Sequence, residues 1–359
     1  MTGNKGEWSE IYAFLKLLAD GKLFSADENL ELIPNLFYPI LKVLRTETNG
    51  HRNYIRNSTI KVIDPQKDLI LLEIPIAKFA TAATLLLDKI KSSATTTFAV
   101  AEIEEFLEFI HVRSLKAPSA DKRDISIVVH DLRTNMTPTL GFSIKSNLGG
   151  PSTLLNAGKT TNFVYRIIGN PFSQNEIREI NAISSRSKVR DRLAAIRAKG
   201  RTLEYVEMTC RNFNINLQMI DIRMPEIIAE MLLLFFDGKG NGTKDLVNLL
   251  ERLNPLGLDL GLHHPLYEYK VKALLTDIAL GMTPSTLWNG RYDATGGYII
   301  VKAGGDIVCY HIYNRNEFQN YLLNRTKLDT PGTDRHGFGS IYTFNGVQRI
   351  NLNLQIRFR

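Results

Sequence analysis

Two apolar runs separated by a polar segment stand out within residues 120–147. Residues 125–130 are rich in β-branched side chains, a pattern that predicts a largely buried strand. Residues 131–139 contain Asp, Asn, Thr and Pro, which favour a loop. Residues 140–146 again contain apolar side chains and predict a returning strand. If the two strands pair antiparallel, the start of the first lies beside the end of the second.

This pairing would bring an acid and a base together at one end of the strand pair. Asp124 precedes the first run and Lys145 lies near the end of the second, so we expect the two side chains to meet. Asp131 would lie seven residues further along the strand, roughly 23 Å from Asp124 at about 3.3 Å per residue. Asp124, and not Asp131, is therefore the candidate metal ligand. Ser143 shares a face with Lys145 because side chains alternate along a strand.

An acid and a lysine placed in this way are the smallest set of side chains that a metal-dependent nuclease needs. Mg²⁺, with Mn²⁺ as a possible substitute, activates water and neutralises charge on a phosphodiester when carboxylates leave water sites open. Lys145 could orient or deprotonate the attacking water. Ser143 brings no negative charge, so a second acid must come from elsewhere. No Asp or Glu occurs between Lys145 and Glu176, which leaves the amino end as a source.

The amino end predicts an amphipathic helix over about residues 6–20. Its apolar stripe consists of Ile11, Phe14, Leu15 and Leu18. Glu10 lies one turn into this helix and could complete a metal site if the helix packs over the sheet. Glu7 is the alternative, one turn earlier on roughly the same side. Either acid could instead be a solvated first-turn residue favoured by the helix dipole.

Breaks in the pattern predict how the chain is organised. Residues 23–73 alternate apolar and polar positions and predict a small β-rich insertion. Residues 176–199 predict one long helix. The Gly- and Pro-rich residues 254–265 indicate a boundary. We therefore expect a nuclease domain over 1–253 and a carboxy-terminal α+β recognition lobe over 254–359.

Composition is that of a soluble globular protein of the reducing cytoplasm. The 359 residues are 44% hydrophobic and 23% charged, with a formal net charge of +7 that favours a polyanionic partner. The two cysteines, Cys210 and Cys309, lie far apart and predict neither a disulfide framework nor a zinc site. No signal peptide or apolar run long enough for a membrane span is present. No glycine-rich loop has the spacing of a nucleotide site, so no nucleotide cofactor is expected.

Basic residues concentrate in two regions that could contact DNA. The segment 184–201 carries seven basic residues and one acid, a net charge of +6. Such a segment either contacts phosphates or is a solvated helix face. The carboxy-terminal region adds basic residues beside polar loops, where they could pair with guanine or adenine or serve solubility alone. The candidate DNA-binding residues are Arg186, Arg190, Arg197, Arg201, Arg315, Lys327, Arg335 and His336.

Several strings in the chain resemble the HpaII family of type II restriction endonucleases. They are NKGEWSE, DISIVVHD, GFSIKSNLGGPSTLLNA, TNFVY, the stretch YNRNEFQNYLLNRTKLDTPGTDRHGFG and the final LNLQIRF. The resemblance implies an α/β fold with a PD-(D/E)xK core, in which helices flank a mixed central sheet. Within that motif Asp124 matches the PD acid, Lys145 the lysine and Glu10 the acid of the first core helix. Two positions depart from it, because Arg123 replaces the proline and Ser143 replaces the second acid.

The resemblance also implies double-stranded DNA as the substrate and cleavage within a short CCGG-like palindrome to leave 5′-phosphate ends. A palindrome has two-fold symmetry, so we expect a homodimer. Two alternatives remain open from the residues alone. The chain could be a non-catalytic DNA-binding protein in which Ser143 marks a lost acid, or a nuclease of another class, such as a repair nuclease or an RNase.

Overall fold

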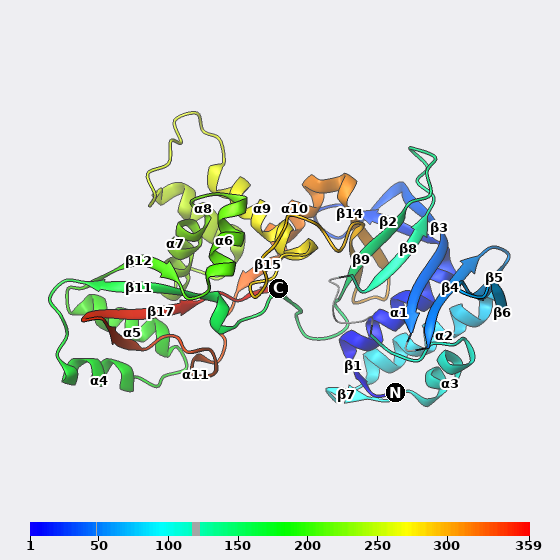
Figure 1. The fold of residues 1–359 in the computed structure, drawn as a ribbon, viewed down its shortest axis with the longest axis horizontal. Coiled ribbons are helices and arrows are strands. Elements are labelled where there is room, and N and C mark those ends of the chain that lie inside the picture. The colour runs from blue at the N-terminus through cyan, green and yellow to red at the C-terminus, as the bar shows by residue number, and fades with distance from the viewer. Residues whose placement is uncertain (48, 117–122) are drawn as a thin grey trace. The chain divides into compact units, whose positions relative to one another are not determined.

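The computed structural model describes residues 1–47, 49–116 and 123–359, and in it the chain forms two compact units (Figure 1). Unit 1 comprises Met1–Ser152 and Tyr292–Tyr321, and unit 2 comprises Thr153–Arg291 and Leu322–Arg359. The predicted ranges 1–253 and 254–359 do not coincide with these units. No helix among the described residues is both long and apolar enough to cross a bilayer.

Unit 1 is built on a mixed sheet with strand order β2-β14-β13-β9-β8-β3-β4-β5-β6. The strands are β2 (Lys22–Ala26), β3 (Leu32–Glu47), β4 (Gly50–Arg56), β5 (Thr59–Asp64), β6 (Leu69–Pro75), β8 (Ile125–Val129), β9 (Thr139–Ser146), β13 (Gly297–Val301) and β14 (Ile307–His311). The pairs β13–β9 and β14–β2 are parallel and the other neighbours are antiparallel. Because β2 also pairs with β3, six of the strands close into a barrel.

The helices α1 (Lys5–Asp20), α2 (Ile76–Ser92) and α3 (Ala101–Phe109) accompany this sheet in unit 1. The short strands β1 (Gly3–Asn4) and β7 (Thr97–Phe98) pair with each other. Helix α1 begins at a capping box between Asn4 and Glu7 and ends at Gly21, whose positive φ of 68° suits a glycine. The apolar stripe predicted for this helix is fully buried in the core of unit 1.

Unit 2 contains two smaller sheets, with strand orders β12-β11-β17-β16 and β10-β18-β15. Their strands are β10 (Thr153–Leu155), β11 (Asn162–Ile168), β12 (Thr202–Met208), β15 (Thr326–Leu328), β16 (Ile341–Phe344), β17 (Val347–Asn353) and β18 (Ile356–Phe358). The helices are α4 (Gln174–Ala182), α5 (Lys188–Ala198), α6 (Arg211–Ile220), α7 (Met224–Phe236), α8 (Thr243–Leu253), α9 (Leu266–Leu280) and α11 (Thr333–His336), while α10 (Arg315–Arg325) begins in unit 1 and ends in unit 2.

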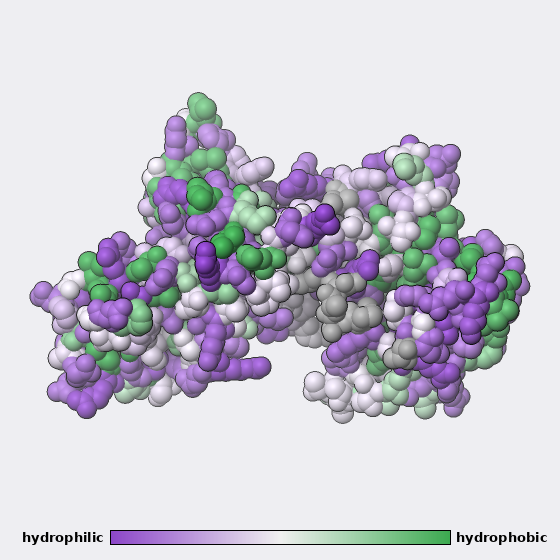
Figure 2. All heavy atoms as spheres, viewed as in Figure 1, coloured by the Kyte–Doolittle hydropathy of each residue, from purple (hydrophilic) through white to green (hydrophobic). Residues whose placement is uncertain are grey.

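The surface of both units is mainly hydrophilic with scattered apolar residues in the view of Figure 2. Among the exposed apolar side chains is Leu262, which is 84% exposed in the loop between α8 and α9. Scattered apolar residues of this kind are normal on a soluble protein. This surface agrees with the globular composition read from the sequence.

Two features of the predicted organisation differ in the structure. Residues 23–73 do form strands, but they belong to the central sheet and are not a separate insertion, because β3 pairs directly with β8. Likewise β13 and β14 join that sheet through β9 and β2 and are not part of a carboxy-terminal lobe. The alternation of apolar and polar residues predicted the strands but gave no information about which strands pair with one another.

The predicted helix over 176–199 is two helices, α4 and α5. The chain leaves α4 at Ile183, which has an extended ψ of 116°. The guanidinium of Arg192 on α5 then donates to the carbonyl oxygens of Asn181 and Ile183 and stabilises the break. The predicted buried stripe of α5, formed by Val189, Leu193 and Ile196, is confirmed.

Candidate active site

The two predicted strands pair antiparallel as β8 and β9, and Asp124 lies at their open end. Ile125 faces Phe142 across the pair, and the Asp124 N–H donates to the Phe142 carbonyl oxygen at 2.8 Å. The side chain of Asp124 accepts two hydrogen bonds at Oδ2, from the Ser143 hydroxyl at 3.0 Å and the Ile144 N–H at 2.6 Å. Asp124 therefore meets Ser143 directly, two residues before Lys145.

Lys145 lies beside these residues in a half-buried position on β9. Its Nζ is 5.4 Å from the ring centroid of Tyr298, which follows from the parallel pairing of β9 with β13. Burial lowers the pKa of Lys145, and the negative charges of Asp124 and Glu10 oppose that effect. A lowered pKa makes proton transfer by an ammonium group easier near neutral pH.

Glu10 is the second candidate acid of this site, and it is half-buried on α1, which packs against β9. Burial, with a further contribution from the nearby charge of Asp124, raises the pKa of Glu10 to about 8. The positive charges of Lys145, Arg45 and Lys116 act in the opposite direction. Its carboxyl group forms no hydrogen bond or ion pair within the described parts of the chain. Such a group is available to a ligand.

Glu7 is engaged elsewhere. Its side chain accepts from the Asn4 N–H in the capping box at 2.8 Å and forms an ion pair with Lys116. Burial raises the pKa of Glu7, but the hydrogen bonds from Lys116 and Asn4 outweigh it, so the net shift is downward. Of the two candidate acids at the amino end, Glu7 thus has a structural role at the helix start.

Two cavities of unit 1 adjoin these residues. Glu10 and Lys145 line a cavity of about 450 Å³ together with Ser146 and the glycines at 149 and 150. Asp124 lines another of about 350 Å³. Its wall also contains Arg45, His51 and Arg123, which the sequence did not single out as site residues.

The donor set fits a hard divalent cation. Oδ1 of Asp124 and the carboxyl of Glu10 have no hydrogen-bond partners in the described part of the chain, and Mg²⁺ commonly uses one or two carboxylates plus waters and phosphate oxygens. Within the same residues no group of three or more His, Cys, Asp or Glu side chains is arranged so that it could hold a metal ion. A cation here would therefore take most of its ligands from water and substrate.

Three of the predicted DNA-binding residues come together in unit 2. Arg186, Arg190 and Arg335 line a cavity of about 1000 Å³ formed by residues 185–190, 235–241 and 329–335. Its wall also has polar side chains that can donate or accept hydrogen bonds. These include Ser185, Asn241, Thr330 and Asp334.

The other predicted DNA-binding residues lie outside that cavity. Arg197 forms an ion pair with Asp237, and Arg201 stacks on Phe172 at 4.5 Å. Lys327, His336 and Arg315 lie on β15, on α11 and at the start of α10. One basic residue of the counted segment is structural, because the buried Arg192 donates to four backbone and side-chain oxygens of unit 2, those of Asn181, Ile183, Gly339 and Ser340.

Comparison with known proteins identifies the class. The sequence profile of the HpaII restriction endonuclease family matches residues 4–358. The chain is 46% identical over 358 residues, 99% of its length and 98% of the relative's, to the type II restriction enzyme HpaII of Haemophilus parainfluenzae. No solved structure matches significantly.

The match places this protein among the restriction endonucleases, which are site-specific deoxyribonucleases. The chain belongs to the HpaII restriction endonuclease family, and its function is that of a type II restriction enzyme. The family resemblance noted in the sequence is thereby confirmed.

Proposed function

We propose that this restriction endonuclease hydrolyses double-stranded DNA at a short CCGG-like palindrome in a Mg²⁺-dependent reaction, with Mn²⁺ as a substitute. The observation that supports this most is the grouping of Asp124, Ser143 and Lys145 at the open end of β8 and β9, with Glu10 close enough to be influenced by the charges of Asp124 and Lys145. The recognised sequence rests on the family alone.

In this proposal Glu10 and Asp124 hold the cation. When bound, it would neutralise charge on the phosphate and acidify a water molecule. Ser143 does not ligate it but fixes the carboxylate of Asp124 through the 3.0 Å hydrogen bond. The serine thus has a positioning role where the motif usually supplies a second acid. Glu7, held in its capping box, is not a ligand.

Lys145 orients the attacking water and balances the negative charge that develops on the phosphate. A bond forms between the water oxygen and phosphorus, and the bond from phosphorus to O3′ breaks. The water loses a proton and the departing O3′ gains one, which leaves 5′-phosphate and 3′-hydroxyl ends. Lys145 is suited to proton transfer because burial lowers its pKa.

We propose that the core of unit 1 belongs to the PD-(D/E)xK class, because its candidate site residues occur in the same order as in that motif. An acid on the first helix, an acid before a strand and a lysine on the antiparallel neighbour follow one another as in that motif. Unit 1 would carry the chemistry. The cavity of unit 2 that contains Arg186, Arg190 and Arg335 would contact the DNA.

A palindromic site has two equivalent strands to cut, so we propose a homodimer with one active site for each strand. We also propose that the protein acts in the cytoplasm, a reducing compartment in which Cys210 and Cys309 would stay thiols.

Incubation with unmodified plasmid and Mg²⁺ tests this function, with Lys145→Ala as a control. We expect discrete fragments that map to CCGG sites from the unaltered protein and intact plasmid from the variant. Intact plasmid that is only retarded on a gel would indicate a DNA-binding protein without catalysis. A smear of fragments, or loss of added RNA, would indicate a nuclease of another class.

A further inference from the structure

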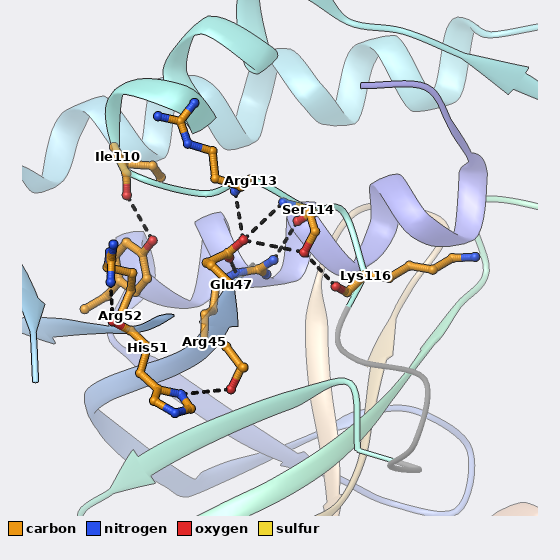
Figure 3. A network of polar contacts seen from close by, with 10 residues as sticks. Arg45, Glu47, His51, Arg52, Ile110, Arg113, Ser114 and Lys116 are labelled. Carbon is orange, nitrogen blue, oxygen red and sulfur yellow. Dashed lines mark hydrogen bonds and ion pairs between the residues drawn. The ribbon is translucent and has the colours of Figure 1, made fainter. Parts of the chain in front are cut away.

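Arg45 on β3 is a largely buried arginine near the candidate active site, and three contacts hold its side chain. That side chain is 9% exposed. Nε donates to Oε1 of Glu47 at 2.8 Å, and Nη2 donates to the carbonyl oxygen of Ser114 at 2.7 Å (Figure 3). The guanidinium carbon also lies 5.1 Å from the ring centroid of Phe14 on α1. Three separate contacts therefore fix the plane of this guanidinium.

The partner of Arg45 is itself fixed. The Glu47 side chain is fully buried, and its Oε2 accepts from the N–H groups of Arg113 at 2.8 Å and Ser114 at 3.1 Å. The same network, drawn in Figure 3, thus joins the end of β3 to the segment that leads to Lys116. An arginine anchored in this way loses little conformational entropy when it binds a further anion.

The remaining nitrogen of Arg45 is free to bind such an anion. Nη1 has no hydrogen-bond partner in the parts of the chain that the structure describes. Phe14 lies four residues after Glu10, so Glu10 is its neighbour on the same side of α1. Arg45 also lines the 350 Å³ cavity that Asp124 borders. The charge of Arg45 therefore acts on Glu10, and Arg45 borders the same cavity as Asp124.

We propose that Arg45 is a further catalytic residue, whose Nη1 binds a non-bridging oxygen of the phosphate under attack, and that Glu47 is the positioning residue that aims it. This inference rests on the proposed function. A rigid guanidinium is well suited to the task, because the charge on the phosphate oxygens grows as water attacks. An ammonium group cannot replace it fully, since its three N–H bonds diverge from a single atom and cannot reach acceptors placed for three separate guanidinium nitrogens.

The chain offers a matched control in Arg52. It lies directly opposite Arg45 in the register of β3 and β4, and its side chain is 7% exposed. It has its own acid, Asp64, at 3.6 Å and donates to the His51 carbonyl oxygen. Arg52 does not line the cavity beside Asp124. Its removal should cost stability as removal of Arg45 does, but it should not affect the reaction.

The test compares Arg45→Gln, Arg45→Lys, Glu47→Gln and Arg52→Gln with the unaltered protein. The single-turnover cleavage rate is measured with saturating CCGG duplex and Mg²⁺. Affinity for the same duplex is measured in Ca²⁺, and thermal unfolding is followed in parallel. We expect Arg45→Gln to lower the rate about 10²- to 10³-fold, as loss of one donor to a developing oxyanion does in other enzymes. Affinity should change less than about tenfold.

The variants separate catalysis from folding. Arg45→Lys should keep the charge and the fold but still cleave at least about tenfold more slowly. The cleavage rate of Glu47→Gln should lie between the rates of Arg45→Lys and the unaltered protein. Arg52→Gln should cut within about threefold of the normal rate even if its unfolding temperature falls. Normal cleavage by Arg45→Gln or Arg45→Lys would overturn the proposal, as would equal rate losses at Arg45 and Arg52. Failure of the unaltered protein to cut would instead refute the proposed function.

Discussion

The ionisation of Glu10 provides a quantitative prediction. Burial, followed by the charge of Asp124, raises the pKa of this carboxyl from 4.5 to about 8 against the opposing effect of Lys145. The difference corresponds to roughly 5 kcal/mol at about 1.4 kcal/mol for each pKa unit. A carboxyl with this pKa is mostly protonated at pH 7, and a bound cation would have to displace its proton.

The sign of the effect on stability follows from the direction of the shift. The folded state binds the proton of Glu10 more tightly than the unfolded chain does. The resulting stability is fully present below about pH 4.5 and is lost as pH rises through about 8. Within that window, the free energy of unfolding should fall by about 1.4 kcal/mol for each pH unit because of this group. Glu10→Gln removes the titration and keeps the size of the side chain.

Urea unfolding of the metal-free protein measures this contribution at pH 5.5, 6.5 and 7.5. The free energy of unfolding of Glu10→Gln, relative to the unaltered protein, should rise by roughly 3 kcal/mol across this range. Ca²⁺ should stabilise the unaltered protein most at pH 7.5 and have little effect on Glu10→Gln. Parallel pH dependence of the two proteins without metal would show that the pKa of Glu10 is not raised, which would refute this prediction.

Single substitutions test the remaining residues of the site in unit 1 and the cavity of unit 2 that contains Arg190. Lys145→Ala should abolish cleavage in a plasmid assay while affinity for the duplex in Ca²⁺ stays within a few-fold; equal loss of both would contradict its catalytic role. Ser143→Ala removes one hydrogen bond to Asp124 and should slow single-turnover cleavage about tenfold, for a cost of about 1.4 kcal/mol. Glu7→Gln weakens the capping box and the ion pair with Lys116, so it should lower the unfolding temperature yet leave cleavage near normal, unlike Glu10→Gln. Arg190→Ala should reduce the slope of log affinity against log salt concentration by about 0.9 if this residue contacts a phosphate, and an unchanged slope would show that it does not.

The local features of the site could be predicted from sequence because short-range patterns determine them. The β-branched run before His130 predicted the first strand, and the turn residues after it predicted a return into a second strand. The antiparallel pairing of the two places Asp124 at the open end. The period of the apolar residues gave α1 and the position of Glu10 on it. In each case the elements that meet are close in the chain or have a strong periodicity.

Long-range features could not be predicted in this way. The parallel pairing of β9 with β13 joins residues more than 150 positions apart, and no local pattern encodes it. It supplies Tyr298 beneath Lys145. Arg45 could not be predicted as a site residue either, because a single arginine in a strand gives no sign that a buried acid such as Glu47 will hold it. The choice between Glu7 and Glu10 needed the capping contacts that only the structure provides.

The most direct test of the central idea is a crystal structure of the protein bound to a CCGG duplex and Ca²⁺, which occupies such sites without supporting rapid cleavage. We predict one ion held by carboxylate oxygens of Glu10 and Asp124, with Lys145 beside the phosphate to be cut. An ion bound by other carboxylates, with Glu10 or Lys145 directed away from the DNA, would contradict it.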